Sequence, residues 1–224
     1  MMTERKTRYL IQGSDFSSEL LPSDPEFLEA FPRVMQSYHS AMKIARTQLE
    51  IWDDEFASAE DHSPIHHMEC RLKRVDSLME KLQRKHYEPT IDNIQRISDI
   101  AGIRVVCNYT NDIYQLRKQI VKASCFRVIR EKDYIQNPKP NGYRSLHLVV
   151  GVMVSCSEGT MELPVEIQLR TIAMDLWASL EHELRYKSDR EFSPESEAKL
   201  KRCAETLAEV DSDMQDLFLE GKGN

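Results

Sequence analysis

The sequence predicts an α/β (α+β) fold in which a small mixed β-sheet is flanked by helices, with one long helix toward each end of the chain. Two observations predict this arrangement. Apolar residues three and four positions apart form long helical stripes toward both ends. Between them, four short segments rich in β-branched residues have the pattern of strands. The 224 residues contain no repeat and no low-complexity linker, so we expect a single structural domain.

The first long helix is predicted from Asp24-Pro25, an acidic N-cap followed by proline at the first helical position. Pro32 has no N–H for an intrahelical hydrogen bond, which favours a regular helix beginning near Arg33. We expect the acidic stretch 53–61 to be a loop. The apolar stripe of this helix consists of Phe31, Met35, Tyr38, Met42, Ala45, Leu49 and Trp52.

A second helix is predicted from Ser63-Pro64 by the same capping pattern, and it would carry a cation-rich surface. Few acids are available to form i,i+4 pairs, so a polyanion site competes with a plain solvated face as the explanation. Its apolar stripe is Ile65, Met68, Leu72, Val75, Met79 and Leu82. The polar residues along its flanks are Arg71, Lys73, Arg74, Ser77, Lys81, Arg84 and Lys85.

Strands and helices alternate through the rest of the chain. The predicted strands are 103–109, 126–134, 146–154 and 161–170, the last two forming a hairpin. Helices are expected from Asn111-Asp112, Thr171 and Ser193-Pro194. The helix from Thr171 carries Leu176, Trp177, Leu180 and Leu184, and the last carries Leu200, Cys203, Leu207, Val210, Met214 and Leu217.

The composition excludes several classes of protein. A net charge of −7 argues against coating of a nucleic-acid duplex, although it leaves room for a local cationic site. Five scattered cysteines without a CxxC pair or zinc spacing indicate reduced thiols. No apolar run approaches the roughly 20 residues that span a bilayer, and residues 1–15 lack the apolar core of a signal peptide, so we expect a cytoplasmic protein without a membrane partner.

The predicted hairpin carries a polar face. Side chains alternate across a strand, so one face of 161–170 bears Glu162, Pro164, Glu166, Gln168 and Arg170. A turn centred at 157–158 would place His147 beside Gln168 and Ser145 beside Arg170. The polar faces of both strands would then coincide, either as a ligand surface or as the wet face of an antiparallel sheet.

Two further stretches favour the ligand surface, namely the segment around Asp99 and the cation-rich helix with Arg71, Lys73, Lys81 and Arg84. Asp99 precedes a small-residue turn that feeds a strand, which suits either a carboxylate aimed at a strand end or a local cap. The loop 139–147 combines two cations and an Asn-Gly turn with Tyr143 and His147, more chemistry than a tight reversal needs. Carboxylates can hold Mg²⁺, cations can neutralise phosphates and aromatic rings can stack on bases, so these residue types together indicate phosphoryl-type transfer. No P-loop and no GxGxxG occur.

Four segments resemble the small alarmone synthetases, the single-domain members of the RelA/SpoT family of GTP pyrophosphokinases. They are SPIHHMECRLKRVDSLMEKLQRK, SDIAGIRVVCNYTNDIY, KDYIQNPKPNGYRSLHL and VEIQLRTIAMDLWASLEHELRYK, in the order and spacing of that family. The resemblance implies a mixed sheet of the nucleotidyltransferase-like synthetase type. It also implies three segments within one structural domain: an N-terminal helical segment at 1–62, the synthetase core at 63–188 and a C-terminal helix at 189–224.

The reaction implied is transfer of the β,γ-pyrophosphate of ATP to the 3′-hydroxyl of GTP or GDP, with Mg²⁺ as cofactor. Asp99 and Glu166 resemble the catalytic, metal-binding acids, Glu166 acting either at the metal or as the base for the 3′-hydroxyl. The positions that resemble ATP contacts are Arg71, Lys73, Ser77, Lys81, Arg84 and Arg104, with Arg71 and Arg104 on either side of adenine. The positions expected around GTP or GDP are Lys132, Lys139, Tyr143, Arg144, His147 and Gln168, with Tyr143 stacked on guanine.

The resemblance carries further expectations. No His-Asp dipeptide of the hydrolase kind appears, and too little chain precedes residue 63 for a hydrolase domain, so we expect synthesis without hydrolysis. A homo-oligomer is expected, a tetramer by resemblance, with allosteric (p)ppGpp or single-stranded RNA as a further partner of some relatives. Two alternatives stay open: a relative that pyrophosphorylates adenine nucleotides or tRNA 3′ ends, and a non-catalytic regulator that binds RNA or nucleotides.

Overall fold

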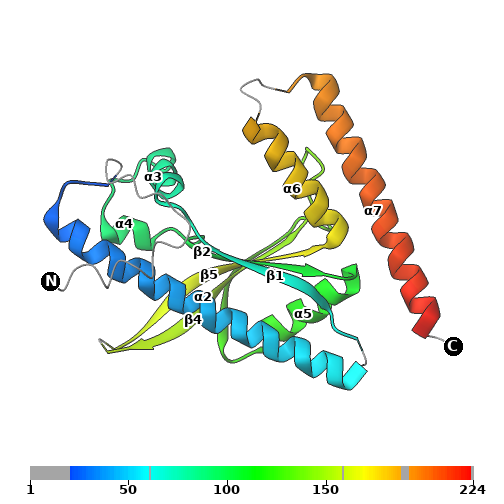
Figure 1. The fold of residues 1–224 in the computed structure, drawn as a ribbon, viewed down its shortest axis with the longest axis horizontal. Helices are drawn as coiled ribbons and strands as arrows, with labels where there is room; N and C mark the ends of the chain where they lie inside the picture. Colours follow the sequence, from blue (N-terminus) through cyan, green and yellow to red (C-terminus); the bar gives the residue numbers. More distant parts are fainter. Residues whose placement is uncertain (1–20, 61, 158, 188–191, 223–224) are drawn as a thin grey trace.

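The fold is a five-stranded mixed sheet with helices on both faces, as the sequence predicts (Figure 1). The structure is a computed structural model that describes residues 21–60, 62–157, 159–187 and 192–222. The sheet order is β1-β2-β5-β4-β3. In chain order the elements are α2 (Pro25–Glu60), β1 (Ile65–Leu72), α3 (Val75–Arg84), α4 (Ile91–Gln95), β2 (Ala101–Cys107), α5 (Thr110–Lys122), β3 (Phe126–Asp133), β4 (Leu146–Cys156), β5 (Gly159–Thr171), α6 (Ile172–Lys187) and α7 (Pro194–Lys222).

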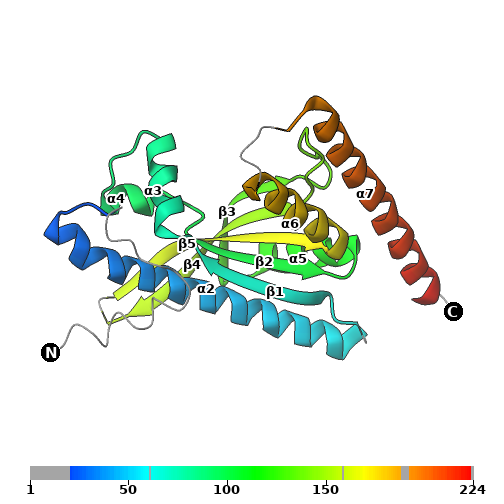
Figure 2. The same ribbon diagram turned by 45° about the horizontal axis from the view of Figure 1, so that its top comes forward.

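One face of the sheet packs on α2 and forms the core. Helix α2 runs along the sheet on the side opposite to α3 and α6 (Figures 1 and 2). All seven residues of its predicted apolar stripe are buried, from Phe31 to Trp52. They join alternate strand residues such as Ile103, Val150 and Ile167 in one hydrophobic cluster. Burial of the apolar layer between α2 and this face of the sheet is the main favourable contribution to folding.

The hairpin register is the one expected from the sequence. β4 and β5 pair antiparallel with His147 opposite Gln168, and Ser145 donates a hydrogen bond from Oγ to the Leu169 carbonyl at 3.1 Å. β5 also pairs parallel with β2, so that Gln168 lies opposite Arg104 on its other side. The alternation in β5 is confirmed, since Val165 and Ile167 are fully buried whereas Pro164, Glu166 and Gln168 are only partly buried.

The predicted second helix from Ser63 is wrong in its first half. Residues Ile65–Leu72 form strand β1, which pairs antiparallel with β2, and helix α3 begins only at Val75. The three-and-four apolar spacing runs through both elements by coincidence, while Met68, Cys70 and Leu72 also satisfy the two-residue period of a strand. Pairing with the free edge of β2 decides between them, because it gives the backbone hydrogen bonds of a whole strand.

The boundaries of α2 also differ from expectation. The helix begins at Pro25, where the Glu26 N–H donates to Asp24 Oδ1 at 3.2 Å, and it continues through Pro32 without a later start. The acidic stretch expected as a loop is helical to Glu60. This stretch contains no glycine or proline. Its first residue, Asp53, accepts hydrogen bonds from Ser63 Oγ and from the Ile65 N–H.

Helices α6 and α7 begin where their capping residues indicate, whereas α5 begins at Thr110, one residue before the predicted Asn111-Asp112 start. Thr171 Oγ1 accepts from the Met174 N–H at the start of α6, and Ser193 Oγ accepts from the Ser196 N–H at the start of α7. The short helix α4, capped by Thr90, was missed by periodicity because five residues are too few to show it. None of the helices in the described part of the chain is long and apolar enough to cross a membrane.

Two apolar stripes remain exposed on α6 and α7. Leu176, Leu180 and Leu184 follow one another at four-residue spacing on α6 and are each about half exposed, at 50%, 51% and 49%. On α7 the predicted stripe divides: Leu200 and Leu207 pack with Ala204 against Trp177, whereas Val210, Met214 and Leu217 are exposed. The two helices therefore form a small second cluster with an apolar outer surface.

Candidate active site

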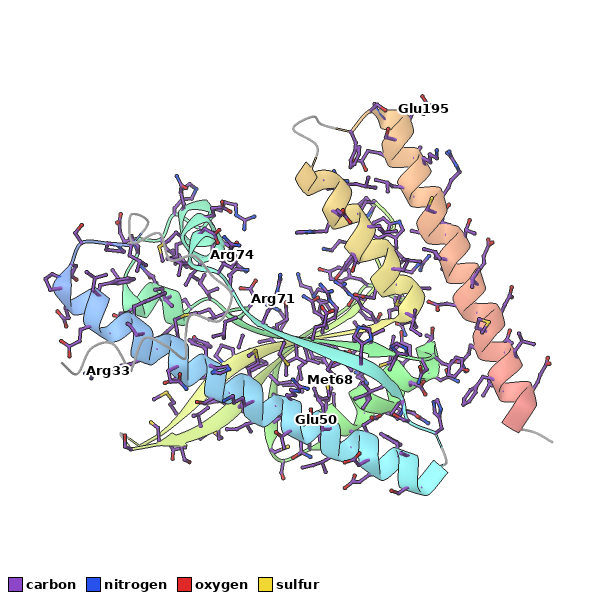
Figure 3. All side chains as sticks on the ribbon, viewed as in Figure 1. Arg33, Glu50, Met68, Arg71, Arg74 and Glu195 are labelled. Carbon is purple, nitrogen blue, oxygen red and sulfur yellow. The ribbon has the colours of Figure 1, made fainter. Side chains whose placement is uncertain are left out.

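The polar face of the sheet gathers most of the residues singled out in the sequence. Lys132 pairs with His147, His147 with Gln168, and Gln168 with Arg104, so these four cross the sheet from β3 to β2 on one face. Arg71 lies at the end of β1 that leads into α3 (Figure 3). Ser77, Lys81 and Arg84 lie on α3, four and three residues apart, and so share one face of that helix.

Asp99 lies between two lysines at the start of β2. Its Oδ2 accepts from Lys73 Nζ at 3.1 Å and from Lys81 Nζ at 2.6 Å. Burial of the carboxyl group raises its pKa, but the Lys81 hydrogen bond and the charges of both lysines outweigh burial, so the pKa lies below its ordinary value. Its Oδ1 is buried and has no hydrogen-bond partner in the described structure. Asp99 is thus an ionised carboxylate with one oxygen available to a cation.

Glu166 is the second acid of the face. Its Oε2 accepts from Gln168 Nε2 at 2.8 Å, and its Oε1 lies 3.6 Å from His147 Nδ1. Burial raises its pKa, but hydrogen bonds from His147 and Gln168 outweigh burial and hold the pKa below its ordinary value. The negative charge of Asp99 acts in the opposite direction, which places the two carboxylates within electrostatic reach of each other.

The loop before β4 is a turn built on Asn141-Gly142. The Gly142 N–H donates to the Lys139 carbonyl at 2.8 Å, the Tyr143 N–H donates to Asn141 Oδ1 at 3.1 Å, and Gly142 has a φ of 94°. The turn holds Lys139 Nζ 4.5 Å from the centroid of the Tyr143 ring. Tyr143 is half-buried.

The Tyr143 hydroxyl joins this loop to the sheet. It accepts from Arg170 Nη2 at 2.7 Å and lies 2.8 Å from His147 Nε2. Because Arg170 donates to the hydroxyl oxygen, the hydroxyl lies between Arg170 and His147, and His147 Nδ1 lies on the side of Glu166. Tyr143 is thus hydrogen-bonded to His147, and His147 in turn lies next to Glu166, so the three side chains connect the loop to the acid.

Two residues of this network are absent from the sites assigned by sequence. Arg170 is only 5% exposed and donates to Tyr143, Gln168 and Asp175. Strand alternation had placed Arg170 on the polar face, but nothing singled it out from its neighbours. Asp175 lies in the first turn of α6, and only the packing of α6 on the end of β5 brings it to the sheet.

Arg144 points away from the other predicted acceptor residues. Its Nη1 donates to the Ile135 carbonyl at 3.3 Å, and its side chain lines a cavity between α6 and α7 together with Trp177 and Asp211. Burial raises the pKa of the Asp211 carboxyl above its ordinary value, although the hydrogen bond from Thr171 and the charge of Arg144 act in the opposite direction. In this arrangement Arg144 contacts the structure behind the loop, not the polar face.

The described residues contain no group of three or more His, Cys, Asp or Glu side chains able to hold a metal ion. The pair Asp99 and Glu166 is nevertheless suited to Mg²⁺, which usually takes one or two carboxylates and completes its shell with water and phosphate oxygens. The residues present therefore fit a hard divalent cation that arrives together with a phosphate-bearing substrate.

Comparisons with known proteins show the family of the chain. The family model described as "Region found in RelA / SpoT proteins" matches residues 70–191, more than half of the chain. The chain belongs to the RelA/SpoT family. GTP pyrophosphokinase YwaC of Bacillus subtilis is 37% identical over 188 residues, which cover 84% of this chain and 90% of that protein.

Solved structures agree with the family assignment. The small alarmone synthetase 1 of Bacillus subtilis bound to its product pppGpp has a TM-score of 0.79 and 32% identity, covering 86% of this chain and 98% of that one. The same enzyme bound to AMPCPP has a TM-score of 0.74 and 30% identity, covering 88% and 100%. This RelA/SpoT chain therefore has the fold of a small alarmone synthetase.

Helices α6 and α7 hold the Asn-Gly turn, and one glycine tests that contact. A Cβ on Gly142 would lie 2.6 Å from the Ala204 Cβ, and its φ is unfavourable for other residues. We expect Gly142→Ala to lower the free energy of unfolding by about 2–4 kcal/mol through strain and overpacking. Urea unfolding measures this change.

Gly159→Ala is the matched control, because Gly159 has a φ of 124° but no atom within 4 Å of the added Cβ. It should cost only the backbone strain, about 1 kcal/mol. Ala204→Gly should recover part of the loss in the Gly142→Ala protein. Equal losses for the two glycine variants would show that α7 does not press on the turn.

Proposed function

We propose that this chain transfers the β,γ-pyrophosphate of ATP to the 3′-hydroxyl of GTP or GDP, giving pppGpp or ppGpp and AMP. The observation that carries the proposal is the position of Asp99 and Glu166 between two sets of cations. Lys73 and Lys81 lie at Asp99, and the loop with Lys139 lies beyond Glu166. Such a site can hold two polyphosphates around one pair of acids.

The ATP half is supported by the geometry of β1, β2 and α3. In the antiparallel pair, Arg71 lies opposite Gly102 and Arg104 opposite Glu69, so the two arginines are diagonal neighbours, about 7–8 Å apart at their backbones. That separation accommodates a planar base between two guanidinium planes, because each stacked layer needs roughly 3.5 Å. The ATP phosphates would then follow Lys73 and the shared face of Ser77, Lys81 and Arg84.

The acceptor half is supported by the Tyr143 ring and its surroundings. A guanine stacked on Tyr143 would have its sugar and phosphates near the cations Lys132 and Lys139, while His147 and Gln168 supply polar contacts on the sheet. Arg144 would support the turn from behind instead of touching the nucleotide.

In the reaction the acceptor 3′-hydroxyl loses its proton, which passes to solvent, and its oxygen forms a bond to the β-phosphorus. The bond between that phosphorus and the α–β bridging oxygen breaks, and AMP leaves with the electron pair. Asp99 and Glu166 would hold Mg²⁺, which when bound offsets the negative charge of the phosphates. The lysines at Asp99 position the ATP phosphates for in-line displacement. The lowered pKa of Glu166 suits a group that stays ionised at the metal better than one that accepts the 3′-hydroxyl proton.

Incubation of the purified protein with labelled ATP and Mg²⁺ and a panel of acceptors tests the proposal. GTP and GDP should become labelled at the 3′ position, with AMP released. Labelling of ATP or of tRNA instead would indicate one of the other acceptors, and no transfer to any acceptor would indicate a binding protein. We also place the protein in the cytoplasm, where ATP and GTP are available and where its five free cysteines stay reduced.

Substitution of the two acids tests the proposed catalytic site. Asp99→Asn and Glu166→Gln preserve size but remove charge, so turnover should fall at least about a thousandfold because charge neutralisation supplies most of the rate enhancement. Affinity for ATP should change less, since the arginines and lysines remain. Initial rates and calorimetric ATP binding measure the two effects.

Glu162→Gln is the matched control for Glu166→Gln. Glu162 lies on the same face of β5 but pairs with Arg127, away from the other acid. Its turnover should stay within about twofold of the unsubstituted enzyme. A Glu166→Gln enzyme with near-normal turnover would remove Glu166 from the mechanism, and the same outcome for Asp99→Asn would remove the metal site.

Tyr143 gives the second prediction. Tyr143→Ala should weaken GTP and GDP binding by roughly five- to 150-fold, the range expected for loss of one aromatic stack, while ATP binding stays nearly unchanged. Tyr143→Phe keeps the ring and loses only the hydroxyl contacts with Arg170 and His147, so its loss should be smaller. Equal losses for ATP and for the acceptor in Tyr143→Ala would point to a folding defect.

The exposed apolar stripes on α6 and α7 give the third prediction. We propose that a second copy of the chain covers them, since three leucines at four-residue spacing present a continuous surface that favours packing on another helix. Light scattering should give a mass above the 26.1 kDa of one chain, consistent with a homotetramer.

Leu180→Glu should shift the particle toward the monomer, because it places a charge in the middle of the covered stripe. Leu28→Glu is the control, as Leu28 is similarly exposed but lies on α2. A 26.1 kDa particle at micromolar concentration for the unsubstituted protein would disprove self-association.

A further inference from the structure

Arg170 is a buried cation in the middle of the acceptor half, and its surroundings determine what it can do. Its side chain is 6% exposed, and Asp175 is its one anionic contact among the described residues, with Nη1 donating to Oδ1 at 3.0 Å. Its other terminal nitrogen, Nη2, donates to the Tyr143 hydroxyl and to Gln168 Oε1. Both of those residues belong to the proposed acceptor site, so Arg170 holds two acceptor contacts at once.

Asp175 fixes this arginine from outside the sheet. It lies in the first turn of α6, where the helix dipole favours a negative charge, and its side chain is 16% exposed. Without its carboxylate, the Arg170 charge would remain buried and unpaired, which is costly. The guanidinium would then turn toward another acceptor or toward water, and the hydrogen bonds to Tyr143 and Gln168 would be lost.

The same carboxylate oxygen also contacts the ATP half. Arg104 Nε lies 3.4 Å from Asp175 Oδ1, while Arg104 Nη1 donates to Glu69 at 3.1 Å. Arg170 therefore holds this oxygen by a hydrogen bond, while Arg104 lies against the same oxygen as an ion pair without a hydrogen bond from Nε. A nucleotide base that stacks on Arg104 would change its contact with Asp175 and leave that oxygen to Arg170, which strengthens the hold on Tyr143.

We infer that Asp175 is a positioning residue that orients Arg170 for acceptor binding and, through Arg104, links the acceptor site to the ATP site. The inference rests on the proposed function for the identity of the two substrates. Asp175 itself contacts neither nucleotide. Its carboxylate affects acceptor binding only through Arg170, and this distinguishes Asp175 from a residue that merely stabilises the fold.

Asp175→Asn tests the inference by steady-state kinetics. The KM for GDP should rise about tenfold, the loss expected for a charge-assisted hydrogen-bond partner, while the KM for ATP, measured at GDP concentrations well below saturation, stays within about twofold. Asp175→Glu, which keeps the charge, should recover part of the loss. Glu29→Gln, which removes an exposed carboxylate paired with Arg33 on α2, should leave both KM values unchanged. An Asp175→Asn enzyme with an unchanged KM for GDP overturns the inference.

A double-mutant cycle identifies the route. In an Arg170→Gln background, Asp175→Asn should raise the KM for GDP no further, because the residue through which it acts is gone. Additive effects of the two substitutions overturn the inference. Melting temperatures of all variants show whether a loss reflects unfolding, and transfer by the unsubstituted enzyme tests the proposed function separately.

Calorimetry measures the link between the two sites without turnover. In the unsubstituted protein, AMPCPP should tighten GDP binding by about threefold, and this ratio should fall to about one in Asp175→Asn. The measurement compares GDP affinity with and without AMPCPP in each protein. An AMPCPP effect that survives unchanged in Asp175→Asn overturns the link through Arg104.

Discussion

The pairing of β5 with β2 on one side and β4 on the other determines where the polar side chains at the centre of the site lie. Gln168 has Arg104 as its parallel neighbour and His147 as its antiparallel neighbour. A register shift of one residue would turn Glu166 toward α2 and expose Ile167 on the opposite face. Such a shift would bury a carboxylate without partners and lose apolar burial. The packing that stabilises the fold therefore also fixes the geometry of the site.

Charge pairing allows this face to exist at low solvent exposure. Asp99 is ionised because Lys73 and Lys81 surround it, and Arg170 is held by Asp175. Removing a charge from water costs several kcal/mol unless a partner or hydrogen bonds offset it. Phosphate groups that enter can take over the lysines, and a cation can take the second oxygen of Asp99. Substrate binding would then exchange partners among existing charges.

The sequence predicted four of the five strands and the polar face that they share, and its failures concern contacts that sequence periodicity does not contain. Alternation in β5 and the length of the hairpin loop predicted the pairing of His147 with Gln168, because a strand has only two faces and a turn sets the register. The strand Ile65–Leu72 was read as helix because strand pairing with β2 is a non-local term that periodicity does not contain. Asp175 was missed for a related reason, since only the docking angle of α6 brings it to Arg170.

Helix α7 connects the acceptor half of the site to the outer surface of the molecule. On its inner side, Ala204 lies so close to Gly142 that only glycine fits in the turn, and Trp177 donates from Nε1 to the Leu200 carbonyl at 2.9 Å. On its outer side, Met214 and its apolar neighbours face solvent. Helix α7 therefore packs on the Asn-Gly turn with one side and presents an apolar surface with the other, so a partner bound to that surface would bind the helix that supports the turn carrying Tyr143.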